Sequence, residues 1–388
     1  MKKFFLFFFL ALKCFAEETA DPLLGFYPVS KSYKVVESSE KVVTHMPPVG
    51  SQGGIGLCSG FAAAAAIDSA NCKALKLQNC SEMAPDQRAS AFDLTRFNRA
   101  IADDPNRDSY DPEKDPSRRS SYKELHIGGN PLLSIDNGMN RVGKIATEKC
   151  APSDQLVSKG QTFEETIALQ QQVWARLEKS FDEYKRISKR RTFAEAEAYA
   201  SDKIANFISP NFKLKVSSQD QLQAFNAETY GAFLSKLLVP KKCATLKDDP
   251  LKIINPQVIN VYPDFGKGER SDYGKMIEKI KEVIIKTDSP IVVTQYCPDK
   301  IIPRNIDDCG PMHTFLIGGY RKVCKSTNDC IEMLQVHNSW GQSWQNLYSG
   351  NRNRDVNNSN DRGGWVDAKK LLARTLYSDQ SLGWLEEE

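Results

Sequence analysis

One cysteine of this chain stands at the start of a segment that favours a helix. In "SQGGIGLCSGFA", residues 51–62, Cys58 comes just before a run of alanines, which are strong helix formers. A thiol attacks only as the thiolate, and at an ordinary pKa of about 8.5 only about 3% is ionised at pH 7. A helix beginning at Cys58 would lower that pKa, because the helix dipole favours negative charge at its N-terminus. The pattern therefore predicts a nucleophilic cysteine.

The residues before this cysteine fit the same chemistry. Gly53, Gly54 and Gly56 would let the backbone turn tightly towards the helix. Gln52 lies six residues before Cys58, and its side-chain amide could donate a hydrogen bond to an oxyanion. The free N–H groups of the first helical turn could supply the other donors.

A nucleophilic cysteine needs a base, and the chain has only four histidines. In "GPMHTFLIGGY", His313 stands at the start of an apolar strand, where a rigid scaffold could hold its ring. In "VHNSWGQSW", Asn338 could accept the second imidazole N–H and fix the tautomer. His337 is a rival base, but neighbouring side chains on a strand point to opposite faces. Cysteine, histidine and asparagine together form a triad suited to acyl transfer.

These three stretches resemble the active-site blocks of papain-family cysteine peptidases, in the same order. A fourth stretch, "HIGGNPLLSIDNGMNRVGKIATEKCAP" at 126–152, is similar to the double-glycine strip of that family and the helix that follows it. The resemblance covers roughly residues 46–152 and 275–370. It implies an α+β fold of two lobes, a helical left lobe and a β-barrel-like right lobe, with the active-site cleft between them.

By position, the resemblance implies a role for four catalytic residues. Cys58 would be the nucleophile, His313 the base and acid, and Asn338 the residue that orients His313. Gln52 would be the oxyanion donor.

The resemblance also implies substrate-binding positions. The Gly128–Gly129 strip would hold an extended peptide, with the backbone of Gly129 pairing with it. Thr314 would line part of the S2 pocket, and Trp340 would shield the histidine and asparagine from water. Trp344 falls on the second tryptophan of the same block.

The function so implied is a secreted cysteine peptidase that hydrolyses peptide bonds through a thioester acyl-enzyme. It needs no metal and no cofactor, and its partner is a peptide or protein substrate. We expect a monomer that binds neither nucleic acid nor, after signal removal, a membrane; the net charge of +3 gives no reason to expect an acidic partner. Two alternatives stay open, a non-catalytic binding module and an acyltransferase or transpeptidase that passes the acyl group to an amine.

Departures from the family pattern matter as well. The residue after the nucleophile is usually tryptophan, and here it is Ser59, which would loosen the packing around the thiol. Ile55 and His126 occupy the positions of a disulfide common in the family. The long inhibitory prosegment of the family is not visible either.

The N-terminus and the cysteines bear on location. Residues 1–16, "MKKFFLFFFLALKCFA", read as a secretory signal with cleavage after Ala16. A lipoprotein that begins at Cys14 is the alternative, but Lys13 fits it poorly. Removal of the signal leaves nine of the ten cysteines, of which eight could pair, for example Cys297 with Cys309 and Cys324 with Cys330.

The rest of the chain divides by composition. We expect an N-terminal extension at 17–45, a helical lobe with the catalytic cysteine at 46–160, a mainly helical insertion at 161–270, and a β-rich lobe with the catalytic histidine and asparagine at 271–388. The insertion either packs beside the cleft and narrows substrate choice or restrains activity, or it is a peripheral elaboration, which loops accept at little cost.

Several segments predict local structure without a function. A capping box of Thr162 and Glu165 precedes a helix with an apolar face. Residues 103–121 and 346–364 read as exposed loops, and the aspartates of the first lack the regular spacing of a calcium site. The basic run at 185–191 reads as a solvated helix face rather than a site for an anionic polymer.

Overall fold

The computed structural model describes residues 29, 32–98, 125, 128–141, 144–157, 160, 163–244, 250–298, 300–301, 303, 309, 312–347, 364–378 and 380–388. The predicted signal sequence, the capping residue Thr162, the loop at 103–121 and most of the loop at 346–364 lie outside these residues, as does His126.

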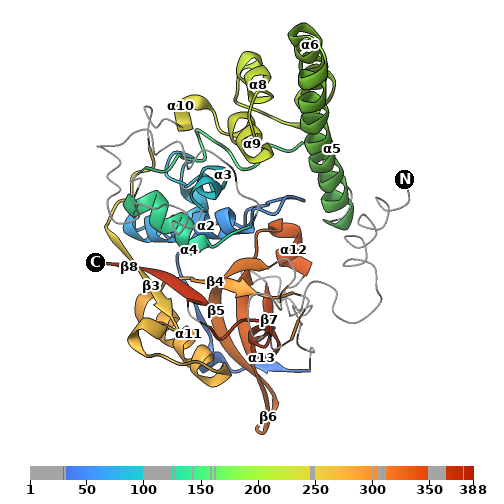
Figure 1. Cartoon of the computed structure of the whole chain (residues 1–388). Coiled ribbons are helices and arrows are strands. Elements are labelled where there is room, and N and C mark those ends of the chain that lie inside the picture. The colour runs from blue at the N-terminus through green and yellow to red at the C-terminus, as the bar shows by residue number, and fades with distance from the viewer. Residues whose placement is uncertain are drawn as a thin grey trace.

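One antiparallel sheet forms the lower half of the molecule in Figure 1. Six strands follow one another across it in the order β3-β8-β4-β5-β6-β7, and β1 and β2 both pair with β5. The strand bounds are β1 Lys34–Val35, β2 Lys41–Val42, β3 Gln257–Tyr262, β4 Ile291–Tyr296, β5 His313–Ser326, β6 Asp329–His337, β7 Trp365–Asp367 and β8 Leu382–Glu387. The apolar strand predicted to start at His313 is thus confirmed, and the fold is α+β.

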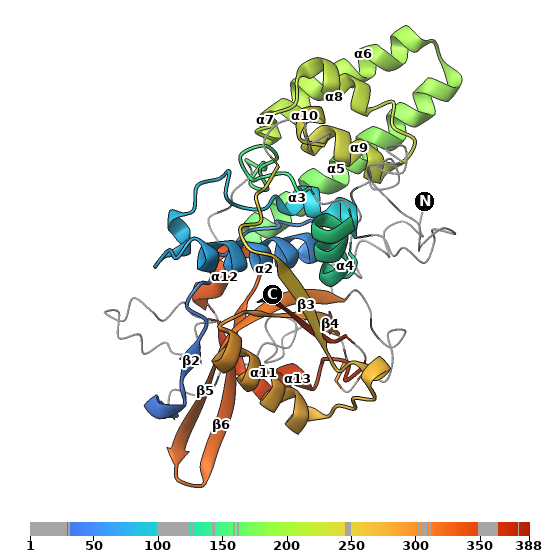
Figure 2. The same ribbon diagram turned by 90° about the vertical axis from the view of Figure 1, so that its left-hand side faces the viewer.

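Helices make up the other half of the molecule and also cover one side of the sheet (Figures 1 and 2). Helices α11 and α13 pack on the sheet, and α12 directly follows the Asn338 segment. The helix bounds are α2 Cys58–Ala74, α3 Ala91–Leu94, α4 Pro131–Asp136, α5 Phe163–Arg190, α6 Phe193–Lys203, α7 Ser209–Asn211, α8 Ser218–Ala224, α9 Tyr230–Leu238, α10 Lys241–Ala244, α11 Tyr273–Thr287, α12 Gly341–Leu347 and α13 Ala368–Leu372.

Helix α2 lies between the helical part and the sheet and contacts both. Of its 17 residues 13 are buried, in keeping with its alanine-rich sequence. Its small side chains allow close approach: a Cβ on Gly60 would lie 2.2 Å from Thr95 Cγ2 and 2.5 Å from the Ala91 carbonyl oxygen of α3. The helix begins at Cys58 itself, so the sequence places the thiol at a buried N-terminus.

The segment from 163 to 244 is mainly helical, as predicted, and its longest helix is α5 (Figure 1). The predicted apolar face of α5 is buried, with Trp174, Leu177 and Phe181 each at most 6% exposed. This face belongs to the same continuous hydrophobic core as α2, which also includes Val292, Leu316 and Leu385 of the sheet, whereas other sheet residues pack with α11 and α13 in a second core. The insertion is therefore packed into the helical part of the molecule.

Four disulfide bonds link eight cysteines among the described residues, and Cys58 is the free thiol there. Two of the bonds, Cys297–Cys309 and Cys324–Cys330, are the pairs suggested by the sequence. The others are Cys72–Cys80 and Cys150–Cys243, and the second closes a long loop that contains the helical insertion. Such bonds form in oxidising compartments, so they fit an extracellular or secreted protein.

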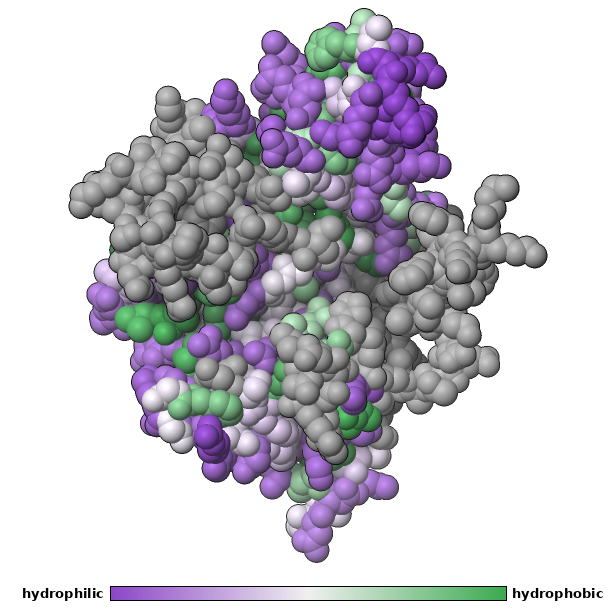
Figure 3. All heavy atoms as spheres, in the orientation of Figure 1, coloured by the Kyte–Doolittle hydropathy of each residue, from purple (hydrophilic) through white to green (hydrophobic). Residues whose placement is uncertain are grey.

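The outer surface of α5 and α6 is strongly polar (Figure 3). Within the basic run, Arg186 is paired with Glu183, its Nε lying 2.9 Å from a carboxylate oxygen. Arg191 lies 3.4 Å from Glu195. These neighbours fit the prediction of a solvated helix face. Among the described helices, none combines the length and apolar character required to cross a lipid bilayer.

The contact at Gly60 leads to a stability prediction. Gly60→Ala should destabilise the fold by about 1–3 kcal/mol, because the added methyl overlaps α3 and this cost exceeds the helix propensity that alanine adds. Gly274→Ala in α11 is the matched control, since its Cβ would meet only Asp272 Oδ1 at 3.4 Å. Chemical denaturation of the three proteins tests this, and equal stability of the two variants would contradict it.

Candidate active site

Cys58 is the first residue of α2, and only 6% of its surface is exposed. The residue before it, Leu57, caps the helix without a side-chain hydrogen bond. The N–H groups of the first turn are therefore not used by a capping side chain. The backbone N–H groups of Cys58 and Ser59, and that of Thr314 at the start of β5, lie near enough to the sulfur to lower its pKa. The thiol thus lies where the helix meets the residue that follows His313.

The electrostatics of this thiol differ from the sequence-based expectation. Burial raises the pKa of Cys58 above its ordinary value, and this effect is larger than the lowering by the three backbone N–H groups. The helix N-terminus acts in the predicted direction, but desolvation of the charged form outweighs it. In the resting protein, the prediction of a lowered pKa is wrong, and Cys58 is held as the neutral thiol.

His313 and Asn338 form the pair that the sequence predicts. His313 Nε2 lies 2.8 Å from Asn338 Oδ1, and both side chains are buried. An amide oxygen only accepts, so Nε2 carries the proton and Nδ1 keeps its lone pair as a base. Burial lowers the pKa of His313 to about 4, against the raising effect of the bond to Asn338. The imidazole is therefore neutral at pH 7 and able to accept a proton.

Two tryptophans pack around this pair. Trp340 stacks on His313 with ring centroids 4.8 Å apart and planes inclined by 27°. Trp344, fully buried, meets Trp340 edge to face at 5.6 Å. This packing holds the imidazole ring in place, and the role of Trp340 in shielding the pair from water stays a prediction.

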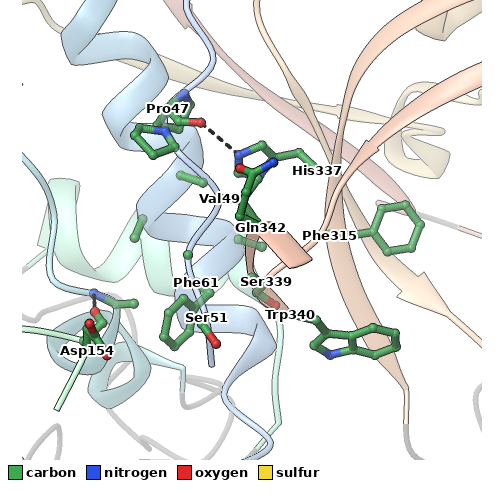
Figure 4. Close-up of a pocket in the computed structure, with 18 of the residues that line it drawn as sticks. Pro47, Val49, Ser51, Phe61, Asp154, Phe315, His337, Ser339, Trp340 and Gln342 are labelled. Carbon is green, nitrogen blue, oxygen red and sulfur yellow. Dashed lines mark hydrogen bonds between the residues drawn. The ribbon is translucent and has the colours of Figure 1, made fainter. Parts of the chain in front are cut away.

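His337 takes no part in the pair. Its Nε2 lies 3.0 Å from the Pro47 carbonyl oxygen, which accepts a hydrogen bond from the ring (Figure 4). Asn338, its neighbour, instead reaches His313. Of the two candidate histidines, His313 is therefore the one that contacts Asn338, as the alternation of side chains along a strand predicts.

Gln52 lies in a loop that is bonded to the Asn338 segment. Its backbone N–H donates to the Ser339 carbonyl at 2.7 Å, and its side-chain Oε1 accepts from the Ser339 hydroxyl. One hydrogen of its Nε2 goes to the Ile55 carbonyl at 2.9 Å. The amide has a second hydrogen, so Gln52 is fixed in place with a donor that can serve an oxyanion.

The double-glycine strip is attached to the helix of the thiol. Gly128 N–H donates to the Gly56 carbonyl at 2.7 Å. Both glycines have positive φ, 79° for Gly128 and 124° for Gly129, which other residues rarely adopt. The strip therefore runs beside the loop that leads to Cys58.

Asn98 is a residue that sequence reasoning missed. Its Nδ2 donates to Ser59 Oγ at 2.5 Å and to the Gly128 carbonyl at 2.6 Å, and its Oδ1 accepts from Ser134 at 3.1 Å. A Cβ on Gly129 would lie 2.3 Å from this amide. Asn98 belongs to no motif, and only its place after buried apolar residues could have suggested an internal role.

This network also corrects the expectation for Ser59. The residue that replaces the usual tryptophan is fully buried, and its hydroxyl bonds to Asn98 and to the Gly128 carbonyl at 3.3 Å. The site is thus closed by hydrogen bonds instead of an aromatic ring, and its packing is not loosened. Thr314 is buried as well, with its hydroxyl donating to the Val293 carbonyl at 2.6 Å. Its predicted contact with substrate stays a prediction.

A cavity of about 630 Å³ lies beside these residues (Figure 4). Its walls come from one face of α2, from α5 and from the ends of β5 and β6, and they include Ser51, Gln170, His337 and Trp340. Cys58 and His313 do not line it. The cavity therefore borders the candidate site at Thr314 and Trp340, although Cys58 itself does not line it. Within the described residues, no group of three or more His, Cys, Asp or Glu side chains is arranged to hold a metal ion.

Comparison with known proteins gives a distant similarity. No family model and no curated protein matches the chain. Among solved structures, it is similar to the SERA5 proenzyme from Plasmodium falciparum, with a TM-score of 0.41 and 11% sequence identity over 95% of this chain and 72% of that one. A similarity at this level does not assign a family.

The network around Asn98 gives a second prediction. Asn98→Ala should lower the free energy of unfolding by about 1–3 kcal/mol, because it leaves buried partners unpaired. Asn140→Ala is the control, since Asn140 is exposed and its amide makes an exposed hydrogen bond to Asp136 at 2.9 Å. Thermal or urea unfolding measures both, and an effect of Asn98→Ala no larger than that of the control would contradict the assignment.

The lowered pKa of His313 gives a third prediction. Between about pH 6.5 and about pH 4 the unfolded chain binds a proton at this residue and the folded chain does not. Stability from this group is therefore present above the unfolded pKa and lost as the pH falls through this window. His313→Gln lacks the group, so the stability of the wild type relative to the variant should fall by on the order of 3 kcal/mol across it. Urea unfolding at a series of pH values measures this, and parallel curves for the two proteins would refute it.

Proposed function

We propose that this protein is a secreted cysteine peptidase of the papain type. The observation that carries the proposal is the set of residues around one sulfur: Cys58 begins a helix, Thr314 lies near it, and His313, the residue before Thr314, is bonded to Asn338. Since Asn338 binds the protonated Nε2, the proposal assigns the lone pair of Nδ1 to the proton of the Cys58 thiol. Taken alone, a buried cysteine would be ordinary core.

On this proposal the molecule has two lobes. The helices around α2 form one lobe and the sheet with α11 and α13 forms the other, and each has a hydrophobic core, the first of which extends to Val292, Leu316 and Leu385 of the sheet where α2 packs on it. Cys58 belongs to the first lobe, and His313 and Asn338 belong to the second. The cleft for substrate would lie between them, with the Gly128–Gly129 strip along one edge.

The proposed reaction begins with neutral partners. The Cys58 proton passes to His313 Nδ1 as the sulfur bonds to the peptide carbonyl carbon, and the oxygen becomes an oxyanion. The Cys58 N–H and the second Nε2 hydrogen of Gln52 stabilise it. His313 then gives its proton to the leaving amine as the C–N bond breaks, and a thioester remains. Water, deprotonated by His313, attacks the thioester, and the acid leaves as the thiol is restored.

Covalent labelling tests the nucleophile first. An epoxide that modifies papain-type thiols, followed by peptide mass spectrometry, should modify Cys58 in the wild type and leave His313→Ala unmodified. The disulfides and the fold of both proteins are checked by unfolding curves. Labelling of other residues, or equal labelling of the two proteins, would remove the support for an activated thiol and favour the binding module.

Kinetics test the remaining roles. Cys58→Ala should abolish hydrolysis, and Gln52→Ala should reduce turnover by ~10² to 10³ because one oxyanion donor is lost. Peptide hydrolysis is measured with and without an added primary amine. Formation of an amide product in place of the acid would assign acyl transfer instead of hydrolysis, and a Cys58→Ala protein with wild-type activity would overturn the scheme.

A further inference from the structure

The first turns of α5 pack directly against the loop that carries Gln52. At Gly54 there is no room for a side chain: a Cβ would lie 2.5 Å from Gln171 Cγ, 2.6 Å from Gln171 N and 2.9 Å from Gln171 Cα. Two of these atoms are backbone, so the contact cannot be relieved by moving a side chain. The insertion thus touches the loop two residues from the proposed oxyanion donor.

A second contact lies beside the first. Gly53 has a φ of 63°, and a Cβ there would lie 2.6 Å from Gln170 Oε1. Gln170 is only 7% exposed, whereas its neighbour Gln172 is exposed. The turn of the loop is therefore formed against a buried side chain of α5.

Helix α5 is itself firmly anchored. Trp174 packs edge to face on Phe212 at 5.2 Å, and Leu177 is fully buried in the core that includes α2. The Cys150–Cys243 disulfide joins α10, the last helix of this segment, to the chain that precedes α5. Helix α5 is thus held in a fixed position against the loop.

The opposite side of the loop is bonded to the segment after β6. Gln52 N–H donates to the Ser339 carbonyl at 2.7 Å, and Gly341 N–H donates to the Gly50 carbonyl at 3.0 Å. The loop is therefore held between α5 on one side and the segment from Ser339 to Gly341 on the other. The position of the Gln52 amide depends on both.

We propose that α5, the first helix of the insertion, positions the oxyanion donor Gln52 and so contributes to catalysis. Gln170 and the close approach of Gln171 to Gly54 are the positioning contacts. This inference rests on the proposed function for its effect on catalysis. It differs from both hypotheses drawn from the sequence, namely that the insertion packs beside the cleft to narrow substrate choice or restrain activity, or that it is a peripheral elaboration.

Two substitutions test the contact, with a matched control. Gly54 has no left-handed φ, so Gly54→Ala adds only the methyl that α5 cannot accommodate. Gln170→Ala removes the buried side chain, and Gln172→Ala removes an identical side chain from the exposed surface of the same helix. Hydrogen exchange of the full-length proteins should be faster across residues 52–57 in the first two and unchanged in the third. Unchanged exchange in Gly54→Ala and Gln170→Ala would overturn the inference whether or not the protein is a peptidase.

Kinetics then separate positioning from general damage. We expect kcat to fall by ~10- to 100-fold in Gly54→Ala, because a displacement of about 1 Å can have that effect, with KM little changed. Alkylation of Cys58 by a small haloacetamide should keep its wild-type rate, since it needs no oxyanion donor. In a Gln52→Ala background, Gly54→Ala should have no further effect on kcat. Additive effects of the two substitutions, or equal losses in kcat and in alkylation, would show that α5 does not act through Gln52.

Discussion

Two backbone hydrogen bonds hold the candidate site together. They pair Gln52 with Ser339 and Gly50 with Gly341, and so they connect the loop before Cys58 to the segment after His337. The thiol belongs to a helix and the imidazole to a sheet, and the hydrophobic core of α2 includes Val292, Leu316 and Leu385 of that sheet. Hydrophobic burial is not directional, so it holds the two elements together without fixing their register. The short backbone pairing adds a directional constraint on the relative positions of Cys58 and His313.

Two kinds of contact hold the groups of the candidate site in place. At the thiol end, Asn98 joins Ser59 to the strip at Gly128 through buried hydrogen bonds. At the imidazole end, stacked aromatic rings perform the same task, with Trp340 between His313 and Trp344. Hydrogen bonds fix direction, whereas stacked rings fix a plane and exclude water. Hydrogen bonds from Asn98 thus hold the segments at Ser59 and Gly128, and the stacked ring of Trp340 holds the plane of the His313 imidazole.

The residues of the site could be predicted because their chemistry is local in the sequence. A cysteine before an alanine-rich segment, a histidine at the start of an apolar strand and an asparagine beyond the next strand are each visible in a short stretch. The pKa directions were not visible, because burial outweighed the helix dipole at Cys58. Asn98 and the contact of α5 with Gly54 were also missed. Both arise between segments far apart in the chain, and no pattern within either segment encodes them.

Burial of the thiol has a consequence for its survival. Thiol–disulfide exchange proceeds by attack of a thiolate, and an oxidising compartment offers many disulfides to attack, including four in this chain. A raised pKa keeps Cys58 protonated, and its small exposed surface excludes large partners. Burial thus disfavours the thiolate that would exchange with these disulfides, and it also disfavours oxidation of the sulfur. The same burial that raises the pKa of Cys58 therefore keeps this cysteine as a free thiol.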